Sequence, residues 1–239
     1  MTNVNRERAG SVGADGKGTG GRFATTLFAK GNDALDAREW TQPSGARQDG
    51  GSPWGRIQWL EHMATGIDSV DTAGHGGIKL SRERNAAMPK EFRQSGGWYE
   101  EDCEAAMPML VFADDLGYDE KRKADLIGVV KNWFPDEYEA VTGEIIPPGE
   151  SHTKDERTFE REHANDMVTY SAIGNDDGTV RVSACRGGRR AWSLGADTYI
   201  YNVPAEEYEQ RSQFGFIVDE SRYEPVEIKK SRTSKEVYG

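Results

Sequence analysis

Thr72-Ala73-Gly74-His75-Gly76-Gly77 and Gly96-Gly97-Trp98-Tyr99-Glu100-Glu101-Asp102-Cys103 are the two stretches that decide how this chain is interpreted, and both lie within residues 52–112. This segment contains three tryptophans, a histidine flanked by glycines and a run of carboxylates. Such a density of aromatic and reactive side chains is typical of a functional site or of the centre of a small core. Neither stretch contains a motif that identifies a reaction.

The composition indicates a folded, acidic protein. The chain has 239 residues, of which 30% are charged, and a formal net charge of −11. Aliphatic residues are few, but six tryptophans and nine tyrosines argue against a disordered chain, which would be poor in aromatic residues. We therefore expect a core that relies on aromatic side chains. The acidic balance does not favour nucleic-acid binding, because nucleic-acid phosphates select basic surfaces.

We expect a cytoplasmic protein without a membrane segment. The sequence has no run of about 18 apolar residues. Residues 1–8 lack the apolar stretch of a secretory signal. Cys103 and Cys185 lie far apart in the sequence and belong to no metal-binding motif, so we expect reduced thiols.

Changes in composition along the chain predict a core between two tails. Residues 1–50 are predicted to form a flexible, glycine-rich tail, and residues 229–239 a basic tail. Residues 51–228 are predicted to form one continuous α+β core. Its first part, 51–146, holds the histidine, tryptophan and acidic motifs, and its second part, 147–228, is rich in strands. We expect small antiparallel sheets packed with several short helices.

Local patterns predict the elements of this core. Apolar residues bounded by turn signals predict strands at 54–62, 66–72, 78–80, 168–173, 180–184, 199–201 and 214–218. Capping residues, prolines and helical spacing predict helices at 82–87, 98–106, 119–133, 135–143, 154–165 and 205–211. Asn175-Asp176-Asp177-Gly178 predicts a hairpin turn.

His75 is the first candidate for a catalytic or metal-binding residue. Its glycine neighbours let the backbone turn sharply and leave the imidazole accessible, as a general base or a metal ligand requires. A turn in which the histidine caps a strand end explains the same pattern. In a helix that begins near residue 98, Glu100 and Glu104 would share one face, away from the face of Tyr99 and Cys103. The carboxylate beside His75 would then be Glu101 or Asp102, although the helix dipole alone also explains an acidic first turn.

Cys103 and its aromatic neighbours are further candidates. A position in the first turn of a helix lowers the pKa of a thiol, which would make Cys103 a nucleophile if a histidine lay within reach. A buried cysteine that packs as a small apolar residue is the alternative. Trp98 and Tyr99 are candidate binding residues beside it.

A basic stretch in the second half is a candidate binding site. Arg186-Gly187-Gly188-Arg189-Arg190 is followed by Trp192. Arg186, Arg189 and Arg190 could hold a phosphate or a nucleic-acid backbone, and the Trp192 indole could stack on a base. A solvated hairpin tip is the alternative.

Four short segments carry a family resemblance, namely Ser52-Pro53-Trp54-Gly55, Ala73-Gly74-His75-Gly76-Gly77-Ile78, residues 82–89 and Trp98-Tyr99-Glu100-Glu101-Asp102-Cys103-Glu104. In this order they resemble a family of proteins of unknown function found in bacteriophages and on mobile segments of bacterial genomes. The likeness is concentrated in residues 52–117 and extends more weakly to 203–208 and 214–216. The resemblance implies a phage-type accessory protein acting in a host cytoplasm, and it implies no catalytic roles.

These observations lead to three functional hypotheses. The first is an interaction protein that acts on a host factor, such as a component of host defence. The second is an enzyme or metal-binding protein with a site at His75 and its acidic neighbours. The third is a virion or assembly component. The sequence identifies no particular cofactor, metal or oligomeric state.

Overall fold

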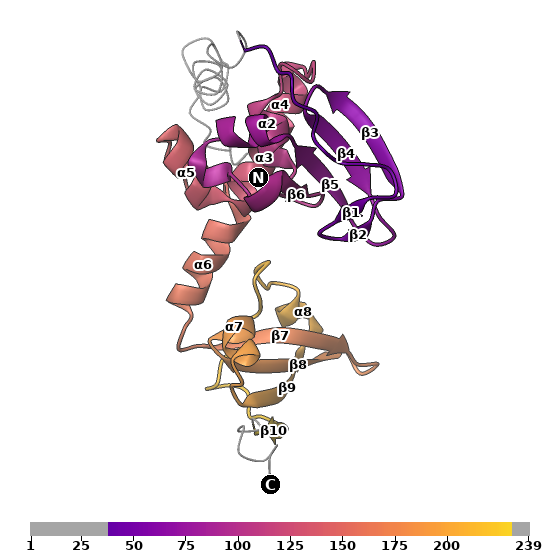
Figure 1. Cartoon of the computed structure of the whole chain (residues 1–239). Helices are drawn as coiled ribbons and strands as arrows, with labels where there is room; N and C mark the ends of the chain where they lie inside the picture. Colours follow the sequence, from indigo (N-terminus) through magenta and orange to yellow (C-terminus); the bar gives the residue numbers. More distant parts are fainter. Residues whose placement is uncertain (1–37, 231–239) are drawn as a thin grey trace, which may run out of the picture. The chain divides into compact units, whose positions relative to one another are not determined.

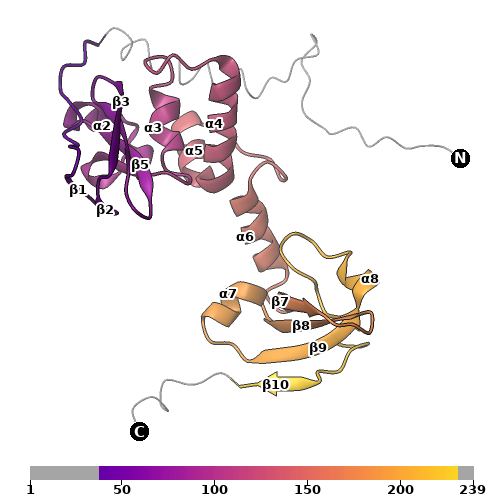
Figure 2. The same ribbon diagram turned by 90° about the vertical axis from the view of Figure 1, so that its right-hand side faces the viewer.

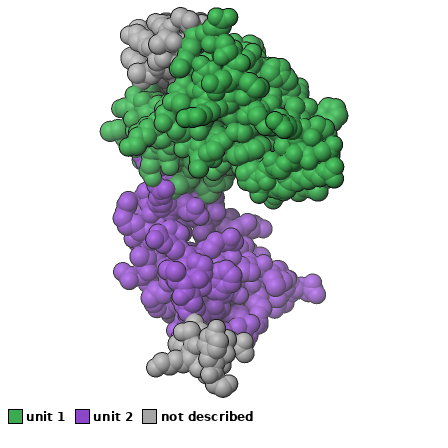
Figure 3. All heavy atoms as spheres, viewed as in Figure 1, with its two compact units in different colours: residues 1–153 green, residues 154–239 purple. Residues whose placement is uncertain are grey.

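The computed structural model describes residues 38–230, so residues 1–37 and 231–239, which make up most of the two expected tails, lie outside it. The chain divides into two compact units, residues 1–153 and residues 154–239 (Figure 3). Each unit has its own cluster of buried apolar residues. The expected α+β class is confirmed, because short helices accompany small antiparallel sheets in both units (Figure 1).

The first unit is built on a four-stranded antiparallel sheet with the order β3-β4-β5-β6. Its strands are β3 (Trp59–Ala64), β4 (Ile67–Asp71), β5 (Gly76–Leu80) and β6 (Trp98–Glu100), and a two-stranded ribbon, β1 (Gly51–Ser52) and β2 (Gly55–Arg56), precedes them. Ile78 is paired with Tyr99, and Ile67 with Leu80. Because paired residues share a face, these four buried side chains form one apolar surface of the sheet.

Helices supply the other half of this core. They are α2 (Arg82–Ala87), α3 (Ala106–Val111), α4 (Glu120–Trp133) and α5 (Pro135–Thr142), with the 3-10 turns η1 (Lys90–Phe92) and η2 (Ser95–Gly97). The side chains of Ser81 and Asp119 accept hydrogen bonds from the first turns of α2 and α4, as their cap positions predict. Leu126, Ile127 and Val130 lie three and four residues apart and bury one face of α4.

The predicted helix over 98–106 is wrong. Trp98–Glu100 forms strand β6, in which Tyr99 is paired with Ile78. Residues 101–105 form turns, and α3 begins only at Ala106. Pro108 lies in the first turn of α3, where its missing N–H has no partner to lose. Pairing with β5 thus prevails over the local preference for a helix.

A buried arginine joins four parts of the first unit. Arg84 is 1% exposed. Its Nε donates a hydrogen bond of 2.7 Å to the carbonyl of Thr65, and its Nη1 pairs with the carboxylate of Asp115. The guanidinium carbon lies 4.3 Å from the ring centroid of Trp40 and 4.7 Å from that of Phe112. These contacts supply the partners that a buried charge requires.

Residues 38–50, expected to belong to the N-terminal tail, contact the first unit although they form no helix or strand. Trp40 packs edge-on against Phe112, with ring centroids 5.6 Å apart. Ser44 is buried, and its hydroxyl donates to the carboxylate of Asp68. The packed part of the chain therefore begins before residue 51.

The second unit contains a four-stranded antiparallel sheet in which neighbours in the sheet are neighbours in the sequence (Figure 2). The strands are β7 (Met167–Gly174), β8 (Thr179–Arg186), β9 (Thr198–Pro204) and β10 (Glu227–Lys229), with α7 (Gly188–Ser193) and α8 (Ala205–Tyr208) beside them. Helix α6 (His152–Glu162) precedes the sheet and begins just before the boundary between the units. Val182, Tyr201 and Val203 belong to the buried cluster of this sheet.

The predicted hairpin over 168–184 is confirmed. The backbone N–H of Asn175 donates to the carbonyl of Thr179 at 2.9 Å, and Gly178 has a φ of +81°, which favours glycine. The predicted strand at 214–218 does not form, because that segment makes only isolated bridges, one of them between Val168 and Ile217.

The continuous core expected for residues 51–228 appears in the structure as two buried clusters, one in each unit. Among the described residues, no helix is long and apolar enough to cross a membrane.

Replacing Asp115 tests the role of the buried arginine. The side chain of Arg84 is 2% exposed and that of Asp115 29%. Asp115→Ala leaves the guanidinium without its carboxylate, and we expect a loss of about 2 kcal/mol in the free energy of unfolding, less than the roughly 3–5 kcal/mol of a fully buried pair. Urea unfolding followed by tryptophan fluorescence measures it.

Asp125→Ala is the matched control. Asp125 pairs with Lys121 at 3.5 Å, but their side chains are 56% and 86% exposed. We expect a change below about 1 kcal/mol. Equal destabilisation by the two substitutions would contradict a special role for Arg84.

Candidate functional site

The candidate site lies at the turn between β4 and β5, which Thr72 closes. The backbone N–H of Thr72 donates to the carbonyl of His75 at 2.8 Å. Its hydroxyl donates to the same carbonyl at 2.7 Å and accepts from the N–H of His75 at 3.2 Å. These bonds fix the backbone of His75, whose side chain remains 61% exposed.

Gly76 and Gly77 are glycines because side chains from neighbouring segments occupy their space. A Cβ atom at Gly76 would lie 2.6 Å from Asp71 Oδ1 and also 2.6 Å from Glu101 Oε2. At Gly77 it would overlap with the carbonyl oxygen of Tyr99 and the ring of Trp54. The φ angles of both glycines are compatible with other residues, so close approach is the reason for glycine here.

His75 meets two carboxylates. Its Nδ1 lies 3.6 Å from Oε1 of Glu100, which pairs with Gly77 in the sheet. One ligand atom from each of His75, Glu100 and Glu101 lies within 4.8 Å of the others. The Glu101 N–H donates to the carbonyl of Gly76 at 3.2 Å and so keeps this residue at the end of β5. One imidazole and two carboxylates form a donor set that suits Zn²⁺ and other first-row divalent ions.

Two acidic residues have roles other than those expected. Glu100, which helical spacing assigned to another face, is an ion-pair partner of His75. Alternation along β6 would have identified it, because Glu100 and Gly77 face each other in adjacent strands. Asp102 is outside the three-residue group, and its N–H donates to Oε2 of Glu100 at 2.9 Å.

Cys103 does not occupy the first turn of a helix, since α3 begins at Ala106. Partial burial, followed by the negative charges of Asp102, Glu100 and Glu104, raises the pKa of the Cys103 thiol. This environment disfavours the thiolate, the form that acts as a nucleophile.

Trp98 and Tyr99 face opposite sides of the sheet. Tyr99 is fully buried, and burial raises its pKa to about 12. Its hydroxyl donates to Oδ1 of Asn85 at 2.8 Å, so it serves the core. Trp98 is half-buried, meets the ring of Trp54 edge-on at 5.8 Å, and has the ammonium of Lys79 5.0 Å from its centroid.

The basic stretch of the second unit ends β8 and forms α7, so the expected hairpin tip is a short helix. Arg186 donates to the carbonyl of Asn165 at 2.7 Å and pairs with Glu220 at 2.9 Å. Trp192 stacks on Tyr170 with ring centroids 4.8 Å apart. Arg189 lies in α7 between them.

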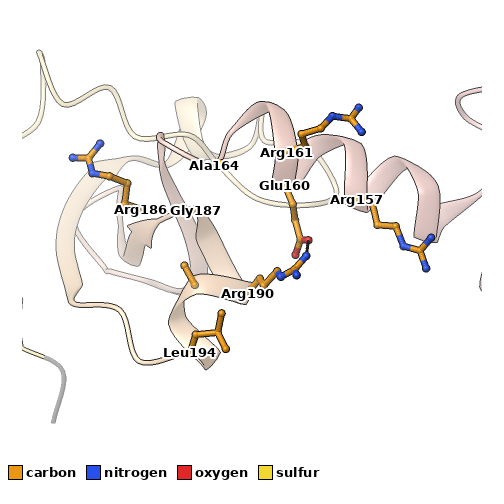
Figure 4. Close-up of a pocket in the computed structure, with 9 residues that line it drawn as sticks. Arg157, Glu160, Arg161, Ala164, Arg186, Gly187, Arg190 and Leu194 are labelled. Carbon is orange, nitrogen blue, oxygen red and sulfur yellow. Dashed lines mark ion pairs between the residues drawn. The ribbon is translucent and has the colours of Figure 1, made fainter. Parts of the chain in front are cut away.

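A hollow of about 340 Å³ lies between α6 and α7. Figure 4 shows the Arg190 side chain directed at Glu160, to which it is paired at 3.5 Å, while those of Arg186 and Arg161 point in other directions. The guanidinium groups thus do not converge on one point. This arrangement is less suited to a single phosphate than the sequence suggested.

The comparisons with known proteins place the His75 site within a family domain. Residues 47–164 match the family model of a domain of unknown function, DUF7007. The matched range contains the β3–β6 sheet, helices α2–α5 and the His75 group. No curated protein and no solved structure matches the chain.

Gly77→Ala tests the close packing beneath the site. The added methyl group would overlap with backbone and with Trp54, and overpacking of this kind costs roughly 1–3 kcal/mol. We expect a lower unfolding midpoint and a changed near-ultraviolet circular dichroism from Trp54. Gly74→Ala is the control, because a Cβ atom there meets nothing within 4 Å. A Gly77→Ala protein as stable as this control would contradict the packing argument.

Proposed function

We propose that the first unit binds a divalent metal ion through His75, Glu100 and Glu101. The observation that carries the proposal is the convergence of their ligand atoms within 4.8 Å of one another. Ligand atoms that share one ion at about 2.0–2.2 Å lie up to roughly 4 Å apart. Small rotations of the exposed His75 and Glu101 side chains would bring the three groups to this separation.

The local charge supports the same proposal. Oxygens of Asp71 and Glu101 converge above Gly76, and Asp102 is next in the chain. Within residues 38–230, no lysine or arginine forms an ion pair with these carboxylates or with Glu100. Negative groups in such proximity repel one another, and a cation between them removes the repulsion.

Three protein ligands leave coordination positions for water or a substrate, as in catalytic metal sites. An ion held here would act as a Lewis acid on a bound oxygen group. The residues of this chain would hold that ion at the accessible end of the sheet, beside the half-buried rings of Trp54 and Trp98. The proposed class is therefore a metal-binding protein with room for a ligand.

Binding of Mn²⁺ and Zn²⁺ to the full-length protein, measured by isothermal titration calorimetry, tests the proposal. We expect one ion per chain, and a loss of affinity of at least about tenfold in His75→Ala and in Glu100→Gln, because each removes one ligand. His62→Ala is the control, since His62 pairs with Asp68 at 2.9 Å but lies outside the group. Equal binding by the wild type and His75→Ala would overturn the assignment.

We also propose a setting and a partner for this protein, namely a phage-type accessory protein that contacts a host factor in the cytoplasm. The resemblance of the SPWG, AGHGGI and WYEEDCE motifs supports the setting. Trp59 supports the contact, because it is 63% exposed on β3, an edge strand of the sheet. Exposed aromatic residues and open strand edges are common at protein interfaces.

Affinity purification from host lysate tests the second proposal. We expect a host protein that saturates the wild-type chain and binds Trp59→Ala at least tenfold more weakly, since large aromatic side chains dominate binding energy. The control is Trp133→Ala, because Trp133 is 47% exposed at the end of α4. Absence of a saturable partner would count against the proposal.

A further inference from the structure

A cationic hollow lies in the first unit, apart from the His75 group. It has a volume of about 490 Å³. Its side chains include three cations and three neutral polar groups, namely Lys79, Arg82, Arg93, Gln42, Ser44 and Asn85. No carboxylate lines it. In a chain with a net charge of −11, this hollow brings three cations together without a carboxylate among its lining residues.

Lys79 is held in place by neutral groups. Its ammonium donates to the carbonyls of Leu80 at 2.9 Å and of Gly96 at 2.5 Å, and it lies over the ring of Trp98. Burial lowers the pKa of Lys79, because it takes the ammonium partly out of water. The carboxylate of Asp68 lies opposite in the sheet.

That carboxylate is engaged elsewhere. One oxygen of Asp68 accepts from the hydroxyl of Ser44, and the other lies 2.9 Å from Nδ1 of His62. Within the described chain, Asp68 forms no ion pair with Lys79. Among the residues that the structure describes, the ammonium of Lys79 thus has no carboxylate partner that would compete with an anion in the hollow.

The two arginines also lack acidic partners. Arg93 donates through Nη2 to the carbonyls of Ala86 and Met88, each at 2.8 Å, and these bonds leave its other nitrogens for a ligand. Arg82 is exposed in the first turn of α2. Within residues 38–230 neither arginine pairs with a carboxylate.

We propose that this hollow binds a small molecule that carries a phosphoryl group with at least two negative charges. Guanidinium and ammonium groups are the usual partners of phosphate oxygens. Three cations match a multiply charged phosphate better than a single carboxylate. The hollow is open to solvent and its volume is usual for a small-ligand site, whereas nucleic acid requires an extended basic surface. The three cations lie within the range that matches the domain of unknown function, and the hollow would bind a ligand separate from the proposed metal ion.

Titration of the full-length protein with inorganic pyrophosphate tests the inference. The buffer contains neither phosphate nor divalent cations, which keeps the result independent of the His75 group. We expect one binding site per chain, with an affinity at least about tenfold lower in Arg82→Gln and in Arg93→Gln. Arg82 is exposed, so its variant should fold normally, which an unchanged thermal unfolding midpoint confirms.

Lys90→Gln is the matched control, because Lys90 is an exposed cation on η1 that does not line the hollow. Its affinity should stay within twofold of the wild type. Equal weakening in Lys90→Gln would overturn the site, since only net charge would then matter. Absence of saturable pyrophosphate binding would also overturn it. Citrate that binds as tightly as pyrophosphate would contradict the phosphoryl assignment.

Discussion

The guanidinium of Arg84 is the constraint on which the first unit depends. A charge that is removed from water must be satisfied by neighbours, and here Thr65, Asp115 and two aromatic rings do so. These partners come from the turn after β3, the loop after α3 and the segment before β1. Their positions are therefore linked through one side chain. Helix α2, which carries Arg84, also carries residues of the cationic hollow.

Local signals explain which elements could be predicted. Ser81, Asp119 and Asn175 act on backbone groups a few residues away, so the helix starts and the hairpin follow from short sequence windows. The helix predicted for residues 98–100 is wrong because these residues form a strand only by pairing with β5, about twenty residues earlier in the chain. The two core clusters also depend on contacts between segments far apart in the sequence, which composition does not encode.

In the candidate site too, some residues could be identified from local sequence and others only from the fold. His75 could be identified because its neighbouring glycines are part of the sequence itself. To predict Glu100 as its partner, one must know whether side chains near residue 100 alternate with the period of a strand, 2, or of a helix, 3.6. A helical period turns Glu100 away from His75, whereas the structure pairs them. The cationic hollow had no local signal, because Lys79, Arg82 and Arg93 come from three different elements or their connections. Such sites emerge only when strand pairing and helix packing are known.

The order of the strands has a consequence for how the chain folds. In both four-stranded sheets, successive strands in the sequence are neighbours in space. The β3–β4, β4–β5 and β7–β8 hairpins close short loops, whereas the other three connections contain helices. Short loops form quickly because little chain entropy is lost. Arg84 instead needs Asp115, 31 residues later, as well as Trp40 well before it. During synthesis, strands β3 to β5 can pair as they emerge, but the arginine is enclosed only after α3 has left the ribosome.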